Sequence, residues 1–265
     1  MPNEFIVSGF PVYVDGDGPD TLVMLHGWPD TYEIWERQVQ HFKHTHRCVR
    51  FTLPGFDDPS TRGFSVSEVV ARILAVVNEV SPNSKVTLML HDWGCLFGYH
   101  FAALHPHKVE QVVAVDVGDA SSPAFARGLS LRAKLMIVAY QMPLALTWYM
   151  KGPVGNYLAR AIAKLLRCKA HEDAIHVGMS YPYAMRWTGA LGGLKMLAEP
   201  TQLACPIFYA YGRYKPFQFQ SKEWLQQLSV TAGCKAEFFN SSHWVMVDCA
   251  EQFNSAVSVW LTLKV

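Results

Sequence analysis

Two kinds of hydrophobic pattern alternate along the first 117 residues. Between residues 65 and 80, apolar side chains recur at helical spacing, which predicts an amphipathic helix. Continuous apolar runs are typical of strands buried on both faces of a parallel sheet, and they occupy residues 21–25, 48–53, 85–90 and 112–117. Shorter runs at residues 5–7 and 12–14 predict an edge hairpin. The regular alternation of strand and helix therefore predicts a parallel α/β sheet.

The segment after the first of these runs predicts a capped helix. Residues 26–29 end the strand, and Asp30 stands where a helix N-cap is expected. Glu33 follows three residues later, as in a capping box. We therefore expect the side chain of Asp30 to bind the first backbone N–H groups of this helix.

The pattern changes in the middle of the chain. Residues 118–195 are rich in Ala, Leu, Met, Tyr and Trp, are interrupted by Pro and Gly, and contain no convincing strand. We predict that they form a helical cap inserted between two strands of a core made of residues 1–117 and 196–265. In the second part of this core, strands are expected at residues 206–211 and 236–239, with helices at residues 222–228 and 251–263.

Composition excludes several classes of protein. The 265 residues are half apolar, and a net charge of +1 gives no basic surface for nucleic acid or an anionic membrane. The longest apolar stretch, residues 135–149, is too interrupted to span a membrane, and no signal peptide is visible. The six cysteines have no CxxC spacing. We expect a cytoplasmic protein, a monomer or homodimer, with no metal and no organic cofactor.

Asp92 is the most informative single residue. It lies between a predicted strand and a helix-like stretch, and it is followed by Trp93 and Gly94. A polar residue beside Gly at such a junction is the pattern of a nucleophile elbow, in which Ser is the common nucleophile. A carboxylate at this place forms an ester by attacking carbon, and water must then cleave that ester.

Two further groups are needed to activate that water. His243 follows the last predicted strand in a polar loop and is the candidate base. The acid that orients it is often found three residues after Gly212, but that position is Lys215, and a cation cannot take this role. Asp116 ends a fully apolar strand, where a carboxylate is costly unless it is paired, so we predict it as the acid, with Asp119 as the alternative.

Backbone N–H groups are expected to hold the oxyanion of the ester intermediate. In an elbow fold one of them comes from the residue after the nucleophile, here Trp93, and the other from the loop after the early strand, here Trp28. Gly27 before Trp28 allows the backbone to approach the substrate closely.

Four motifs taken together resemble the epoxide hydrolase and haloalkane dehalogenase branch of the α/β-hydrolases. They lie in the family's order at residues 26–30, 53–57, 91–94 and 242–244, and the resemblance covers nearly the whole chain apart from the cap. The resemblance implies an α/β-hydrolase fold, with a mostly parallel central sheet flanked by helices and a helical cap insertion. It also implies a small apolar electrophilic substrate and water as the only partners.

The resemblance leaves the reaction open. Epoxide hydrolases tolerate an aromatic residue at the position of Trp28 and protonate the epoxide oxygen with cap tyrosines, for which Tyr183, Tyr181 and Tyr140 are candidates. An acid at the position of Asp116 is instead a trait of one group of dehalogenases. We expect an epoxide hydrolase, with a haloalkane dehalogenase and a non-catalytic ligand-binding protein of the same fold as the alternatives.

Overall fold

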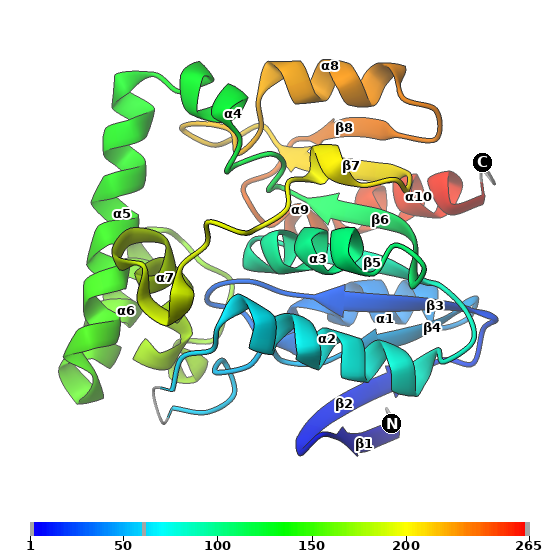
Figure 1. Cartoon of the computed structure of the whole chain (residues 1–265), viewed down its shortest axis with the longest axis horizontal. Helices are drawn as coiled ribbons and strands as arrows, with labels where there is room; N and C mark the ends of the chain where they lie inside the picture. The colour runs from blue at the N-terminus through cyan, green and yellow to red at the C-terminus, as the bar shows by residue number, and fades with distance from the viewer. Residues whose placement is uncertain (1–2, 60–61, 263–265) are drawn as a thin grey trace.

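The core of the protein is an eight-stranded sheet in the order β1-β2-β4-β3-β5-β6-β7-β8, seen in a computed structural model that describes residues 3–59 and 62–262. β2 pairs antiparallel with β1 and with β4, and the six strands from β4 to β8 in this order are parallel to one another (Figure 1). The predicted edge hairpin and mostly parallel sheet are confirmed. The strands are β1 (Asn3–Val7), β2 (Phe10–Asp15), β3 (Asp20–Leu25), β4 (His46–Arg50), β5 (Val86–His91), β6 (Val109–Val115), β7 (Ile207–Gly212) and β8 (Lys235–Phe239).

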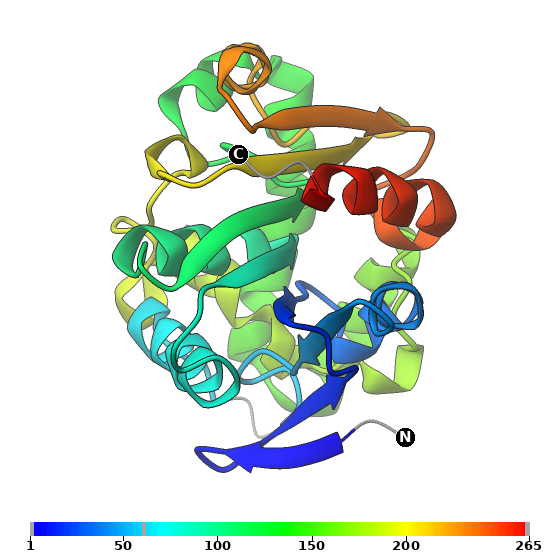
Figure 2. The ribbon, with the colours of Figure 1, turned by 90° about the vertical axis from the view of Figure 1, so that its right-hand side faces the viewer.

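Helices cover both faces of the sheet. Helices α2 (Val66–Val80) and α3 (Trp93–Leu104) lie on one side, and α1 (Glu36–Phe42) and α10 (Ala250–Thr262) lie on the other (Figure 2). Alternate strand residues serve the two faces because successive side chains of a strand point in opposite directions. On β5, Leu88 packs in the cluster under α2 and α3, whereas Met89 packs in the cluster under α1 and α10. This double burial explains the continuous apolar runs.

Two local predictions differ from the structure. Asp30 does not cap the first helix: Thr31 is the N-cap of the short 3-10 helix η1 (Tyr32–Trp35), and the buried Asp30 carboxylate accepts a hydrogen bond from Trp244 Nε1 at 2.9 Å. In the apolar run at residues 48–53, strand β4 ends at Arg50. The rest of the run is a buried loop in which Leu53 N donates to His26 Nε2 at 2.9 Å. Burial alone therefore did not distinguish strand from loop.

The segment between β6 and β7 contains helices and no strand, as expected. Figure 1 shows its helices, apart from the last one, beyond the carboxyl ends of the parallel strands, on the side of the molecule where α3 begins. They are α4 (Pro123–Gly128), α5 (Leu131–Met150), α6 (Gly152–Leu165) and α7 (Tyr181–Thr188), with short 3-10 helices η2 (Glu172–Ala174), η3 (Val177–Ser180), η4 (Ala190–Gly192) and η5 (Pro200–Gln202). That residues 118–195 form a separate cap domain stays a prediction.

The chain ends with elements that return to the sheet. Helix α8 (Lys222–Val230) precedes β8, and the short helix α9 (Val245–Asp248) leads into α10. Within the described part of the chain, no helix is long and apolar enough to cross a membrane.

Candidate active site

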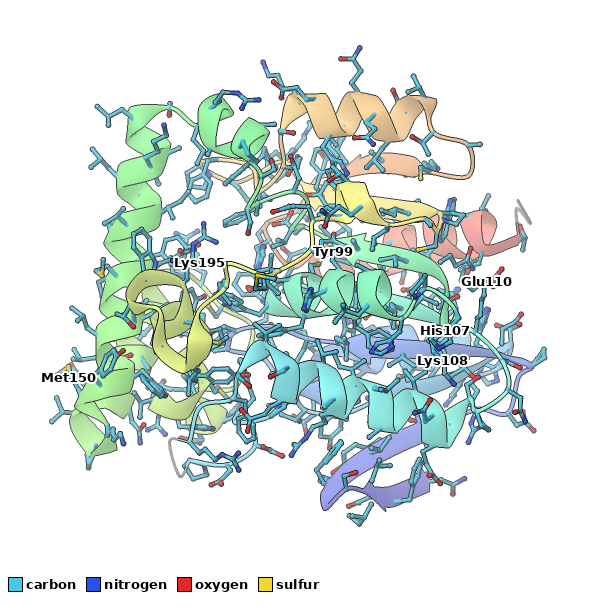
Figure 3. The ribbon with its side chains drawn as sticks, in the orientation of Figure 1. Tyr99, His107, Lys108, Glu110, Met150 and Lys195 are labelled. Atoms are coloured by element: carbon cyan, nitrogen blue, oxygen red, sulfur yellow. The ribbon has the colours of Figure 1, made fainter. Side chains whose placement is uncertain are left out.

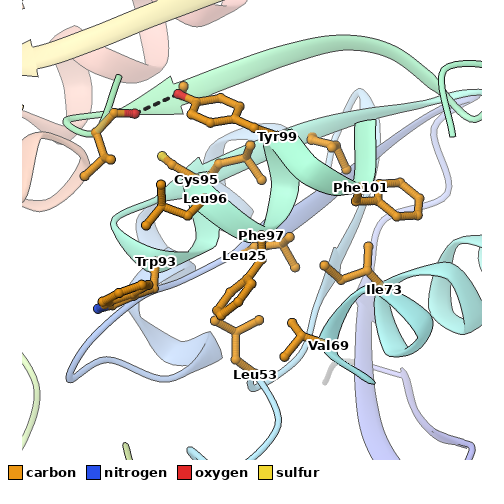
Figure 4. Packing of buried hydrophobic residues seen from close by; sticks show 14 of the residues in the cluster. Leu25, Leu53, Val69, Ile73, Trp93, Cys95, Leu96, Phe97, Tyr99 and Phe101 are labelled. Atoms are coloured by element: carbon orange, nitrogen blue, oxygen red, sulfur yellow. Dashed lines mark hydrogen bonds between the residues drawn. The ribbon is translucent and has the colours of Figure 1, made fainter. Parts of the chain in front are cut away.

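Asp92 lies at a sharp turn between β5 and α3. Its backbone has φ 52° and ψ −121°, a strained conformation for a residue with a side chain. The turn leaves room only for glycine nearby: a Cβ on Gly94 would lie 2.4 Å from the carbonyl oxygen of Leu25, and a Cβ on Gly27 would lie 2.4 Å from the Cβ of Asp92. Figure 4 shows how α3 is anchored behind this turn, with Leu96, Phe97 and Phe101 packed into the core.

His243 joins Asp92 to Asp116. Its Nδ1 lies 2.5 Å from the Oδ2 of Asp116, and its Nε2 lies 3.6 Å from the Oδ2 of Asp92. The His243 side chain is 16% exposed, whereas that of Asp116 is fully buried. The structure thus brings together the three residues predicted from separate parts of the sequence. In this geometry Asp116 contacts Nδ1 of the imidazole and Nε2 faces Asp92.

Asp116 is held by three partners. Asp116 directly follows β6 and has a φ of 66°. The carbonyl of the next residue, Val117, accepts a hydrogen bond from Tyr99 Oη of α3 at 2.7 Å (Figure 4). The Oδ1 of Asp116 accepts from Gly212 N at 2.8 Å and from Lys215 Nζ at 2.5 Å, while Oδ2 faces His243. The cost of burying this carboxylate is offset by these hydrogen bonds.

Lys215 therefore has a place in the site that sequence reasoning missed. It occupies the position three residues after Gly212, where the acid of such a site is often found. It is the counterion of Asp116, which follows the neighbouring strand β6. Burial lowers the pKa of Lys215, and the Asp116 carboxylate opposes that shift, so the ammonium form is favoured by the pair. The only sequence signal was the placement of a basic residue shortly after β7.

Asp119 is engaged elsewhere. Its Oδ1 accepts a hydrogen bond from Ser221 N at 2.7 Å, and its Oδ2 accepts from the hydroxyls of Ser221 and Ser122 at 2.6 Å each. Those serines are the N-caps of α8 and α4. Asp119 thus ties two helix starts together, and in the structure it is Asp116 that reaches the imidazole.

The two carboxylates control the charge of His243. Burial lowers the pKa of the imidazole, but the hydrogen bonds and negative charges of Asp116 and Asp92 outweigh it and raise the pKa to about 9. At neutral pH the imidazolium form is therefore favoured while both carboxylates are charged.

Trp28 and Trp93, which were predicted to form the oxyanion site, both line the cavity that contains Asp92. The first N–H groups of a helix have no partner within it, so the N–H of Trp93 has no acceptor within α3. A Cβ on Gly27 would lie 2.6 Å from Trp93 N, which shows how closely the loop that carries Trp28 approaches this donor.

The three tyrosine candidates separate into two groups. Tyr140 of α5 and Tyr183 of α7 line the cavity above Asp92, and the ring of Tyr183 meets those of Trp28 and Trp93 edge-on at centroid distances of 5.6 and 5.2 Å. Burial, followed by the charge of Asp92, raises the pKa of Tyr183 well above its ordinary value, so it stays a proton donor. Tyr181 is not among the residues that line the cavity and packs against Phe56 and Phe64.

The cavity has a volume of about 650 Å³ and is mostly apolar. Its wall is shared between the carboxyl end of the sheet and the helical segment, and it includes Leu96, Phe125, Ile137, Phe217 and Phe219. The size and lining suit a small apolar ligand with a few polar contacts.

A second hollow of about 700 Å³ lies at the amino ends of the parallel strands. Its lining includes Asp20, Ser84 and Glu110, and Figure 3 shows Glu110 on the side of the molecule opposite Met150 of α5. Neither Asp92 nor His243 lines it, so we place the chemistry in the cavity at the carboxyl ends. No group of His, Cys, Asp or Glu in the described residues is arranged to hold a metal ion.

Comparison with known proteins agrees with this architecture. The family described as "alpha/beta hydrolase fold" matches residues 20–150. "Epoxide hydrolase 2" of Caenorhabditis elegans is 35% identical over 112 residues, which are 40% of this chain and 31% of that relative, so the match spans less than a third of the relative's length. "Epoxide hydrolase 3" of Xenopus tropicalis is 21% identical over 272 residues, covering 95% of this chain and 74% of the relative.

Solved structures of similar proteins extend the match over the whole chain. A mutant of an epoxide hydrolase from Bacillus megaterium, complexed with its diol product, has a TM-score of 0.74 at 20% identity and covers 98% of this chain and 99% of its own. Potato epoxide hydrolase I has a TM-score of 0.64 at 18% identity, with 98% of each chain covered. At this identity the structures show the fold, and the predicted α/β-hydrolase fold is confirmed.

Proposed function

We propose that this chain, which belongs to the α/β-hydrolase superfamily, is an epoxide hydrolase that acts on apolar substrates through an ester on Asp92. The observation that carries the proposal is the contact of His243 with both Asp92 and Asp116 beneath a cavity that also contains Tyr140 and Tyr183. The similarity to epoxide hydrolases supports the choice of reaction. No metal or organic cofactor takes part in the scheme.

In the first step Asp92 opens the epoxide. One carboxylate oxygen attacks an epoxide carbon, and the electron pair of the broken C–O bond passes to the epoxide oxygen. That oxygen takes a proton from the hydroxyl of Tyr183 or Tyr140, and solvent later returns the proton to the phenolate. The raised pKa values of both tyrosines keep them protonated before the reaction.

In the second step His243 activates water. Ester formation removes the negative charge of Asp92, which is one of the charges that raise the pKa of His243. The imidazolium then releases its proton more readily and can act as a base. Neutral His243 takes a proton from the water as its oxygen attacks the ester carbonyl carbon, and the N–H groups of Trp28 and Trp93 hold the oxyanion. The C–O bond to the substrate then breaks, the leaving oxygen takes the proton from His243, and release of the diol restores the Asp92 carboxylate with one oxygen from water.

A trapped intermediate tests this mechanism. His243→Gln should accumulate an ester when mixed with styrene oxide, because the water-activating base is missing. Mass spectrometry should find the mass of one substrate added to the peptide that contains Asp92. Asp92→Asn should give neither the adduct nor the diol. Absence of any adduct on Asp92 in a folded His243→Gln variant would refute the covalent mechanism and favour a ligand-binding protein of the same fold.

One observation favours a haloalkane dehalogenase as the second candidate. The indole Nε1 of Trp28 is buried without a protein hydrogen-bond acceptor among the described residues, and an indole N–H beside the nucleophile is suited to a halide. Release of bromide from 1-bromohexane, without hydrolysis of styrene oxide, would select this candidate. Both reactions share the ester on Asp92.

A further inference from the structure

Arg186 places a positive charge in the wall of the catalytic cavity. It lies on α7 three residues after Tyr183, so both side chains are on the same face of the helix, and both line the cavity that contains Asp92. Burial lowers the pKa of its guanidinium, and the tyrosines at residues 140 and 183 oppose that shift. Arg186 is thus a cation next to the proposed proton donors.

The other buried cation of this cavity already has a carboxylate partner. Lys215 pairs with Asp116 at 2.5 Å, and at the rim Lys169 pairs with Asp248 at 2.8 Å. Among the described residues, Arg186 forms no ion pair within 4.0 Å. Arg167 also lines the cavity without an ion pair, but it is exposed, so Arg186 is the part-buried positive charge of the wall that no carboxylate of the described residues neutralises by contact.

Glu199 is the acidic group whose charge acts on Arg186, but no ion pair within 4.0 Å joins the two side chains. At the start of η5 the backbone carbonyl of Glu199 accepts from Gln202 N and its backbone N–H donates to Gln202 Oε1, each at 3.0 Å. Burial, followed by the charge of Asp119, raises the pKa of Glu199 to about 7, and Arg186 only partly opposes that rise. Glu199 is therefore a weak counterion for Arg186.

An unpaired guanidinium in a part-buried apolar site is costly unless a ligand completes it. Its planar donors match a carboxylate, with which it forms two parallel hydrogen bonds. We propose that Arg186 binds a carboxylate of the substrate, so that the substrates of this protein are epoxides carried by an apolar group that ends in an acid. The epoxide part rests on the proposed function, whereas the carboxylate subsite does not.

The placement on α7 also fixes where the acid would lie. Three residues of helix correspond to a rise of about 4.5 Å, so the backbone positions of Tyr183 and Arg186 are about one helical turn apart. A substrate held at both points would direct its epoxide carbon at Asp92 in one orientation. We therefore expect Arg186 to select the carbon that is attacked as well as the substrate.

A binding experiment with unreactive ligands tests the subsite apart from the chemistry. At pH 7.5, 4-phenylbutanoate and its methyl ester are titrated into the full chain and followed by tryptophan fluorescence, because Trp28 and Trp93 line the cavity. The acid should bind at least about 10-fold more tightly than the ester, the range of about 1.4 kcal/mol expected for a charge-assisted pair. Arg186→Met should remove this preference and leave ester binding unchanged, and Arg186→Lys should keep part of it.

Controls separate this role from packing or from tuning of the tyrosines. Arg132→Met, an exposed arginine on α5 that does not line the cavity, should bind both ligands as the wild type does. Equal binding of acid and ester by the wild type, or an equal loss of both in a folded Arg186→Met variant, would overturn the proposal. Melting temperature and circular dichroism establish folding.

A pair of reactive substrates distinguishes the proposed carboxylate subsite from the proposed epoxide reaction. Turnover of an aryl epoxy acid is compared with that of its methyl ester, and the diol is measured. Preference for the bound acid without any diol would refute the epoxide reaction and keep the subsite. Equal kcat/KM for the acid and the ester in both the wild type and Arg186→Met would refute the subsite and keep the reaction.

Discussion

At the scale of single residues, Asp116 and Asp119 show how two buried carboxylates three positions apart acquire different tasks. Asp116 faces His243, whereas Asp119 accepts hydrogen bonds from the serines that cap α4 and α8. The backbone turns at Asp116, whose φ is 66°, so the two side chains leave the chain in different directions.

Exchanging each carboxylate for an amide should therefore show which of the two serves the chemistry. Asp116→Asn removes the charge that orients the imidazole, and we expect hydrolysis of the ester to slow by about 10³–10⁴-fold, as for the acid of a serine protease triad. Asp119→Asn should lower the free energy of unfolding by about 1–3 kcal/mol and change turnover by only a few-fold. Single-turnover kinetics and urea denaturation measure the two effects; the reverse pattern would make Asp119 the acid.

Asp92 and His243 could be proposed from the sequence because each lies in a short motif with local meaning, and the structure places Asp92 Oδ2 3.6 Å from His243 Nε2. The partnership of Lys215 was not predictable in the same way, because Lys215 and Asp116 are 99 positions apart and meet only when β6 and β7 pair. Arg186 was missed for a similar reason: it lies in a segment whose helices are apparent from the sequence but whose cavity-facing side is not.

At the scale of elements, the helical segment decides which tyrosine reaches the nucleophile. Tyr181 and Tyr183 are two positions apart on α7, which places them on different faces of the helix. Nearly all of the first part of α7 is buried, so hydrophobicity along the sequence could not show which face meets the cavity. The strands were easier to predict, because burial on both faces leaves a continuous apolar run.

Removing single hydroxyls on these helices should give a matched series. Tyr183→Phe and Tyr140→Phe should each slow formation of the ester on Asp92 by about 10–100-fold if both donate to the epoxide oxygen, at the low end of what positioned proton transfer supplies. Tyr181→Phe should leave this rate unchanged. Stopped-flow tryptophan fluorescence follows the step. If Tyr181→Phe alone slows ester formation, the assignment of the donors is wrong.

At the scale of the whole molecule, the charges of the site couple its chemistry to its stability. Two buried groups around the nucleophile have raised pKa values: His243, at about 9, and Asp30, which burial raises to about 7. The folded state thus holds protons more tightly than the unfolded chain at both places. By linkage, each group makes the free energy of unfolding fall as pH rises between its unfolded and folded pKa values.

The two groups lose their stabilising effect in successive pH ranges. The contribution of Asp30 is complete below its ordinary value of 3.8 and is lost as pH rises through about 7, whereas that of His243 is complete below 6.5 and is lost as pH rises through about 9. For His243, the rise of the pKa from 6.5 to about 9 corresponds to roughly 3 kcal/mol. Through these two groups the wild type should therefore lose stability as pH rises, most clearly between pH 6.5 and pH 9, above the range in which buried His26 and His91, with lowered pKa values, act in the opposite direction.

Two variants show which group causes each part of this loss of stability. His243→Gln should flatten the loss between pH 6.5 and pH 9, because the titrating imidazole is gone, and should keep the loss at lower pH. Asp30→Asn should flatten the loss of stability at lower pH and keep the loss between pH 6.5 and pH 9. Its amide still accepts the hydrogen bond from Trp244 and has no proton to release. Urea denaturation at half-unit steps of pH gives the free energies of unfolding, and Lys215, present in all three proteins, cancels in their comparison. An unchanged slope above pH 6.5 in His243→Gln would mean that Asp92 and Asp116 do not hold the imidazole in its charged form.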